Sequence, residues 1–346
     1  MRRSETPTLP SHLTKQGVSL LRPDPLREAV RAHAFADTGP SEARRGASEI
    51  ARLGGHEVLA VVFFGSRKTK PSDDPWSAHD FFVLLRDHHG FYASLHGHGA
   101  LLRSPALLAA LNRWLPPNQL SLRLALPGGP LRAKCAVISL DTLLRETSER
   151  RRDHFCAGRL FQPAEVAWVR DEQAAAAALL ALTSAHRITY DWARPFLPAE
   201  FDAAGYARTL LGVSMAAEIR PEPKGRAEAL VDSQRDYYSA VYGLLLAELL
   251  VGGELVQRDG GRYALARPVT AWESAFAQLF FRWSLLRATA RWAKHVLTFD
   301  DWLEYILRKA QRHTGQDISL SERERRWPLV FLWPRVLRYL REKDRP

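Results

Sequence analysis

The chain has 346 residues, enough for about two domains of ordinary size and for a core that needs no disulfide bonds. Apolar residues make up 46% and charged residues 25%, which excludes a wholly disordered chain. The two cysteines, Cys135 and Cys156, show neither a disulfide framework nor metal-ligand spacing, so a reducing cytosol is expected. No run of 18 apolar residues occurs, so the sequence predicts no transmembrane segment.

Positive charge dominates the chain. The 49 Lys and Arg outnumber the 38 Asp and Glu to give a net charge of +11, and only eight of the 49 are Lys. Because Arg binds phosphate groups bidentately, this bias suits nucleotides, nucleic acid or anionic lipid headgroups. A GC-rich genome would produce the same excess of Arg and Ala, and it favours a bacterial source.

The N-terminal half predicts a small sheet with helices. Residues 1–25 are polar and are expected to form a loose leader without the apolar segment of a secretory signal. Residues 41–54 predict a helix, and the apolar run at 57–64 predicts a buried strand that ends at Gly65-Ser66. A polar loop leads to a second buried strand at 79–85.

A helix, a third strand and two more helices follow. The pattern predicts a helix at 105–115 that Pro116-Pro117 ends, a strand at 131–140, and helices at 141–160 and 172–186. Two strands, a helix-rich crossover and a third strand indicate an α+β or α/β domain with a small mixed sheet over residues 26–170.

Residues 171–266 predict a mostly helical second domain. Helical patterns cover 203–219 and 236–250, the latter closed by Gly252-Gly253, and a hairpin is expected at 254–266 around Asp259-Gly260-Gly261. Helices with one hairpin are typical of a winged-helix-like domain.

Residues 267–346 predict a basic amphipathic segment. Six of the ten Trp lie between 272 and 333, and residues 281–346 hold 15 Lys and Arg against eight Asp and Glu. A helical wheel gathers an apolar face with basic margins, formed by Leu279, Trp283, Leu286, Ala290 and Leu297 beside Arg287, Arg291 and Lys294, with Arg282 on the other edge. A core helix would show the same pattern.

The last part of this segment favours an anionic membrane surface. Two Trp-Pro steps begin at Trp327 and Trp333, and Arg335, Arg338 and Arg341 follow at helical spacing. Trp at the headgroup level and Arg on lipid phosphates would suit such a surface-lying segment.

The strongest chemical signal joins the first two strands. Gly65-Ser66 closes the first, and Asp80 opens the second. Nucleotidyltransferases of the polymerase-beta superfamily resemble this layout, in which backbone N–H groups hold nucleotide phosphates and strand carboxylates hold Mg²⁺. Many strand-to-helix turns contain Gly-Ser, and Asp80 could simply cap its strand. A second carboxylate is missing, because Ala78 and Phe82 occupy the alternate positions.

Four segments together resemble the mitochondrial translocator assembly and maintenance family, which are soluble-fold phosphatidate cytidylyltransferases (CDP-diacylglycerol synthases). The first two are Phe64-Gly65-Ser66 with Asp80-Phe81-Phe82-Val83, and Lys134-Cys135-Ala136-Val137-Ile138-Ser139 for the family's Lys-x-x-Val-Ile-Ser. The third is Ala157-Gly158-Arg159-Leu160-Phe161-Gln162-Pro163, and the fourth runs from Ser214 to Glu218 and Arg220. Their order and spacing agree across residues 57–245.

The chain departs from the family pattern at several positions. Arg67 replaces a Gly, Gln162 replaces a Lys, and Glu218 replaces an Asp. The polar groups of a Trp-His-x-x-Asn stretch are lost near residues 91–95. The chain is therefore similar to the family as a distant member.

The resemblance implies a peripheral-membrane enzyme on the cytoplasmic face of a bacterial inner membrane. It would use Mg²⁺, CTP and phosphatidic acid to make CDP-diacylglycerol and pyrophosphate. Asp80 and Lys134 would be catalytic, and Asp80, Asp87 and Glu218 are the expected metal ligands. The residues expected to bind nucleotide or phosphate are Gly65, Ser66, Arg67, Arg159 and Arg220.

Three alternatives stay open. The same fold could transfer a nucleotide to RNA, protein or a small molecule, although no nucleic-acid partner is favoured. A non-catalytic membrane-binding relative would explain the missing second carboxylate. The histidines at 88, 89, 96 and 98 could suggest zinc, but they lack cysteine or acidic partners at zinc spacing and are expected to lie on the surface.

Overall fold

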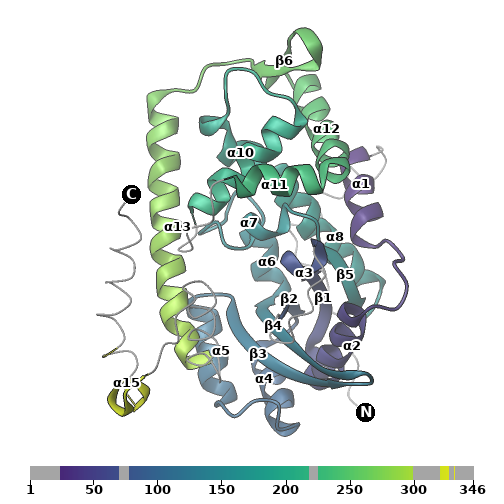
Figure 1. Cartoon of the computed structure of the whole chain (residues 1–346), viewed down its shortest axis with the longest axis vertical. Helices are drawn as coiled ribbons and strands as arrows, with labels where there is room; N and C mark the ends of the chain where they lie inside the picture. The colour runs from purple at the N-terminus through teal and green to yellow at the C-terminus, as the bar shows by residue number, and fades with distance from the viewer. Residues whose placement is uncertain (1–23, 70–77, 218–224, 299–319, 327–330, 332–346) are drawn as a thin grey trace, which may run out of the picture.

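The computed structural model describes residues 24–69, 78–217, 225–298, 320–326 and Phe331. Five strands form one mixed sheet in the order β3-β4-β2-β1-β5, and helices lie around it (Figure 1). The strands are β1 (Val58–Phe64), β2 (His79–Leu85), β3 (Asn118–Leu126), β4 (Gly129–Ser139) and β5 (Glu165–Val169). The predicted α+β class and its small mixed sheet are confirmed.

The three predicted strands are β1, β2 and β4. β2 and β4 run parallel, and the chain between them forms α4 (His88–Gly97), α5 (Pro105–Trp114) and β3. The other neighbouring strands are antiparallel. The sequence analysis missed β3 and β5, which are the two edge strands. A continuous apolar run marks a central strand, whereas these edge strands carry polar residues on one face.

One face of the sheet is covered by α2 (Glu42–Gly54), α4 and α5. The Ser41 side chain accepts a hydrogen bond from Arg44 N and starts α2, and Gly55, with φ 66°, ends it before the 3₁₀ turn η2 (Gly55–Glu57). Ile50, Phe81 and Val137 belong to the same buried apolar cluster on this face.

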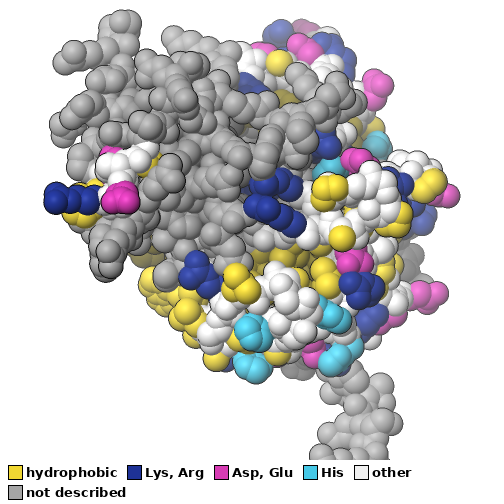
Figure 2. Space-filling model, turned by 60° about the horizontal axis from the view of Figure 1, so that its bottom comes forward, with side chains coloured by type: hydrophobic (Ala, Val, Ile, Leu, Met, Phe, Trp, Pro, Cys, Tyr) yellow, Lys and Arg dark blue, Asp and Glu magenta, His cyan; other side chains and the backbone are white. Residues whose placement is uncertain are grey.

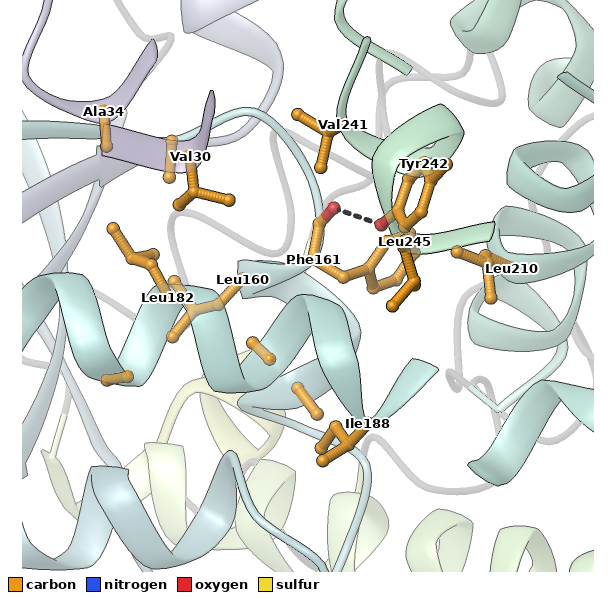
Figure 3. Close-up of a cluster of buried hydrophobic side chains, with 14 of the residues drawn as sticks. Val30, Ala34, Leu160, Phe161, Leu182, Ile188, Leu210, Val241, Tyr242 and Leu245 are labelled. Carbon is orange, nitrogen blue, oxygen red and sulfur yellow. Dashed lines mark hydrogen bonds between the residues drawn. The ribbon is translucent and has the colours of Figure 1, made fainter. Parts of the chain in front are cut away.

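The opposite face packs against a larger helical layer. It includes α1 (Pro25–Ala34), α6 (Leu140–Glu146), α7 (Ala157–Leu160), α8 (Glu172–Arg187), α10 (Ala203–Ala216) and α12 (Arg235–Val251). One apolar cluster runs from Phe82 of the sheet through Leu182 to Leu245 (Figure 3). Within it, Tyr242 Oη donates a 2.7 Å hydrogen bond to the Phe161 carbonyl. The sheet and the helices of residues 171–266 therefore share a core.

The helical part ends in the predicted hairpin. α9 (Thr189–Ala193), η3 (Arg194–Phe196) and α11 (Arg226–Ser233) complete its helices. β6 (Leu255–Gln257) and β7 (Tyr263–Leu265) pair around the 3₁₀ turn η4 (Asp259–Gly261). The hairpin is thus confirmed, as are the helices at 172–186 and 236–250.

The helix predicted over 141–160 is interrupted. α6 ends at Glu146, and α7 begins only at Ala157. Glu146 is buried and accepts hydrogen bonds from the backbone N and Nε of Arg152, at 2.9 and 2.8 Å. These bonds hold the chain in a turn, so a continuous helix cannot form there.

The 28-residue helix α13 (Ala271–Thr298) runs along one side of the molecule, from the helical part down to α5 (Figure 1). The short α15 (Glu322–Arg326) lies near its lower end. None of the helices in the described ranges has the length and apolarity needed to cross a bilayer.

The basic edge of α13 faces the protein, which corrects the expectation that it flanks a lipid-facing surface. Arg291 is 1% exposed, and its Nη2 lies 2.6 Å from Asp153 Oδ2. Arg287 Nε binds the same oxygen at 2.7 Å. Lys294 donates to the carbonyl of Leu115 and, at 3.1 Å, to that of Pro117, just beyond the C-terminus of α5. These cations dock α13.

The apolar edge of α13 is exposed instead. Trp272, Phe276, Leu279, Trp283 and Leu286 are between 51% and 78% exposed. Their spacings of four and three residues place them on one side of the helix. The predicted leader (1–25) is described only from Asp24 onward. The proposed membrane residues Trp327, Trp333, Arg335 and Arg338 lie outside the described residues.

Candidate functional site

Asp80 and Lys134 lie side by side near one end of the sheet. The parallel pairing of β2 with β4 sets Asp80 directly opposite Lys134, so both side chains emerge on the same face. Lys134 Nζ is 3.8 Å from Asp80 Oδ1, and the two side chains are 20% and 27% exposed. The structure therefore brings together the two residues that the sequence analysis named as catalytic, in a partly open setting.

Gly65 completes this end of the sheet. Phe64, the last residue of β1, pairs with Asp80, so the chain turns at Gly65 beside the carboxylate. Gly65 has φ 85°, and a Cβ there would lie 2.9 Å from Asp80 Oδ2. Ser66 begins α3 (Ser66–Thr69), where Lys68 N donates to the Gly65 carbonyl at 3.1 Å. One helical turn has a small dipole, so any anion binding here would depend on the turn's own N–H groups.

Arg67 points to the other side of the sheet. Its Nη2 lies 3.6 Å from Glu42 Oε2, on the face that α2 covers. His79 shares that surroundings, since its Nε2 is 3.8 Å from the same oxygen. Burial, reinforced by the positive charge of Arg67, lowers the pKa of His79. Arg67 is thus grouped with Glu42 and His79 rather than with Asp80.

Arg159 lies on the Asp80 face, one aromatic layer away. Phe82, two residues beyond Asp80 on the same face of β2, contacts the Phe155 ring edge-on at 6.4 Å between centroids. The Arg159 guanidinium lies 3.8 Å from the centroid of that ring, and Arg291 lies 4.5 Å from it. Arg159 Nη1 also donates to the Phe155 carbonyl at 3.0 Å. The cation–π contacts hold Arg159 near the site without a carboxylate partner of its own among these contacts.

Asp87 lies at the far end of β2, which corrects its assignment as a second metal ligand. Seven residues of extended strand separate it from Asp80 by roughly 20 Å. Asp87 caps α4, because its Oδ2 accepts a 2.8 Å hydrogen bond from Gly90 N. That hydrogen bond lowers the pKa of Asp87. A single ion could not bind both carboxylates.

The fourth segment of the family pattern is described only at its start. Ser214 is buried, and its Oγ lies 2.7 Å from His154 Nε2. Burial lowers the pKa of His154 to about 3, so this histidine is neutral at pH 7. Glu218 and Arg220 lie outside the described residues.

Asp80 is compatible with a magnesium ion that a nucleotide helps to hold. Within the described ranges, no group of three His, Cys, Asp or Glu side chains converges as a metal site. Mg²⁺ commonly binds one or two carboxylates and completes its shell with water and substrate phosphates. Because Gly65 has no side chain, the Oδ2 atom of Asp80 stays uncovered on that side. Among the four histidines, 89, 96 and 98 are exposed as expected, whereas His88 is buried.

The antiparallel β3–β4 pair adds polar residues that the sequence analysis missed. Ser121 lies opposite Lys134, and Arg123 lies opposite Arg132, so all four side chains emerge on the Asp80 face. Leu120, Leu122 and Leu124 fill the opposite face. The period-two alternation of residues 118–126 carried the signal for this arrangement.

This end of the molecule is basic on its surface. Figure 2 shows Lys and Arg side chains near the middle of the face, beside hydrophobic patches and next to residues that are not described. A positive surface attracts anionic ligands.

Comparison with known proteins yields no assignment. No protein-family model matches the chain, and no curated protein is found to be similar to it.

Proposed function

We propose that this protein is a Mg²⁺-dependent phosphatidate cytidylyltransferase that acts at a membrane surface, on the cytoplasmic face of a bacterial inner membrane. The observation that carries the proposal is the pairing of Asp80 with Lys134 beside the Gly65 turn. A carboxylate for a metal, an ammonium for a phosphate and an open backbone turn are the three groups that nucleotidyl transfer requires at one place.

In the proposed reaction, a phosphate oxygen of phosphatidic acid attacks the α-phosphorus of CTP. The bond between the α-phosphorus and the bridging oxygen breaks, and pyrophosphate leaves with that electron pair. The products are CDP-diacylglycerol and pyrophosphate. Because the attacking phosphate is already an anion, no general base is needed.

The residues of the chain position and neutralise charge. The backbone at Gly65 and Ser66 would hold the triphosphate, and Lys134 would neutralise a phosphate oxygen next to the reacting centre. Asp80 would hold Mg²⁺, which supplies charge neutralisation on the triphosphate when bound. Arg159 lies too close to Phe155 to approach the centre directly, and it would contribute to the positive field on this face.

The exposed stripe of α13 supports a membrane setting. Phe276, Leu279 and Trp283 present apolar surface on a helix whose cations bind the protein. A lipid substrate stays in its bilayer, so an enzyme that uses it needs a surface of this kind. The apolar stripe, rather than the basic edge, would contact the lipid.

Pyrophosphate release tests the proposal. The purified full chain is incubated with Mg²⁺ and each nucleoside triphosphate in turn, with and without phosphatidate vesicles. We expect release only with CTP and phosphatidate together, and its loss in Asp80→Asn. Asp141→Asn serves as the control, because Asp141 is exposed on α6.

Other outcomes would point elsewhere. Turnover with a different acceptor would indicate another nucleotidyltransferase. Vesicle binding without turnover under any condition would favour a non-catalytic relative, consistent with the single carboxylate that the described residues bring to the site.

A further inference from the structure

The polar face of the β3–β4 hairpin continues beyond the Asp80–Lys134 pair. Arg132 is two residues before Lys134 on β4, and Arg123 lies directly opposite it on β3. Two residues along a strand span about 6.7 Å, so the arginines lie one pair further toward the hairpin tip. β2 begins at His79, which pairs with Ala133, so the arginine pair extends past the end of β2.

Two cations opposite each other have an unfavourable energy on their own. Like charges at directly paired positions destabilise a sheet by several tenths of a kcal/mol or more. An anion between them reverses the sign of that contribution. Arg supplies a planar fork that matches phosphate oxygens, whereas Lys134 supplies a point charge.

The order of the strands assigns the two flanks of Asp80. Gly65 lies at the end of β1 on one side of β2, and the β3–β4 pair lies on the other side. In phosphoryl transfer the attacking and leaving oxygens lie roughly in line on opposite sides of the phosphorus. If pyrophosphate departs on the Gly65 side, the attacking group must approach from the β4–β3 side.

We infer that Arg123 and Arg132 form the binding site for the phosphate monoester of the acceptor. This inference rests on the proposed function and names the part of the site that takes the second substrate. The arginines hold the acceptor phosphate bidentately, and they orient one of its oxygens toward the centre at Asp80 and Lys134. Recognition depends on the phosphate monoester, whether it belongs to a lipid or to a soluble molecule.

The test compares Arg123→Gln/Arg132→Gln with Arg258→Gln, a control that removes one exposed arginine from the β6–β7 hairpin region. With dihexanoyl phosphatidate as acceptor, we expect the KM for phosphatidate to rise by at least about tenfold in the double variant. The KM for CTP should stay within about twofold, because the triphosphate binds on the other flank. Glycerol 3-phosphate in the same assay separates a lipid-specific site from a general phosphate site.

An unchanged KM for phosphatidate in an active double variant overturns the inference and leaves the proposed function intact. If the wild type makes no CDP-diacylglycerol, the proposed function fails, and calorimetric binding of dihexanoyl phosphatidate decides the inference. Binding that weakens at least about tenfold in the double variant but not in Arg258→Gln supports the anion site. Absent or equal binding overturns it. Arg123→Lys, which keeps the charge and loses the fork, replaces the double variant if that variant does not fold.

Discussion

The carboxylate of Asp80 lies against the backbone of Gly65. The antiparallel pairing of Phe64 with Asp80 turns the chain at that point, and a Cβ on Gly65 would approach Asp80 Oδ2 to 2.9 Å. The glycine is therefore required twice, by its φ of 85° and by the space that the carboxylate occupies.

Gly65→Ala should reduce both stability and the proposed activity. The left-handed φ costs about 1–2 kcal/mol in a residue with a side chain, and the new methyl group displaces Asp80. We expect pyrophosphate release to fall by at least about tenfold. Gly99→Ala is the matched control, because Gly99 has φ 69° but no atom within 4 Å of its added Cβ. Equal activity losses in the two variants would contradict a role for the contact with Asp80.

Asp87→Ala should weaken α4 without affecting catalysis. Loss of the side-chain cap on Gly90 N typically destabilises a protein by about 1 kcal/mol. Asp87 lies at the other end of β2 from Asp80, so kcat and the Mg²⁺ dependence of turnover should match the wild type. Urea unfolding and a magnesium titration measure the two effects. A raised magnesium requirement at unchanged stability would restore Asp87 as a ligand.

Arg291→Ala should strongly destabilise the docking of α13. Burial acts to raise the pKa of Asp153, but Arg291 and Arg287 outweigh it and lower that pKa, so the carboxylate is ionised. Removing one partner of a buried ion pair costs about 3–5 kcal/mol. Arg282→Ala, at an exposed position on the same helix, should change the free energy of unfolding by about 0.5 kcal/mol or less. Similar unfolding midpoints for both variants would show that the buried pair does not hold the helix.

Replacing the exposed apolar stripe should affect membrane binding alone. The triple variant Phe276→Ser/Leu279→Ser/Trp283→Ser removes side chains that are at least half exposed, so its unfolding free energy should match the wild type. Partial immersion of these side chains contributes about 1 kcal/mol each, so vesicle affinity should drop by about 100-fold. Val251→Ser, at a 90% exposed position on α12, is the control. Undiminished sedimentation with phosphatidate vesicles would exclude this face of α13 as the contact.

Stability should fall as the pH drops below 6.5. Burial lowers the pKa of His154 to about 3 and that of His186 to about 4. The unfolded chain takes up both protons near pH 6.5, while the folded protein does not, so stability is lost from pH 6.5 down toward pH 4. At pH 5 each histidine should account for about 2 kcal/mol. His186→Gln should flatten the pH dependence of the unfolding free energy, and an unaltered slope would show that His186 is already protonated in the folded protein.

The sequence by itself determined the central elements of this protein. Continuous apolar runs define β1, β2 and β4, because a strand buried on both faces has few polar residues. Proline, glycine and capping residues set the ends of α2, α5, α8 and α12. The pairing of Gly65-Ser66 with Asp80 was also visible, since both lie at the ends of such runs.

Only the tertiary structure decided which residues meet. Strand order and register set Lys134 beside Asp80 and moved Arg67 and Asp87 away, and neither order nor register follows from local periodicity. An amphipathic wheel does not specify which face is buried. In α13, buried Asp153 and the carbonyls at the end of α5 bind the cations, and the apolar edge is therefore exposed.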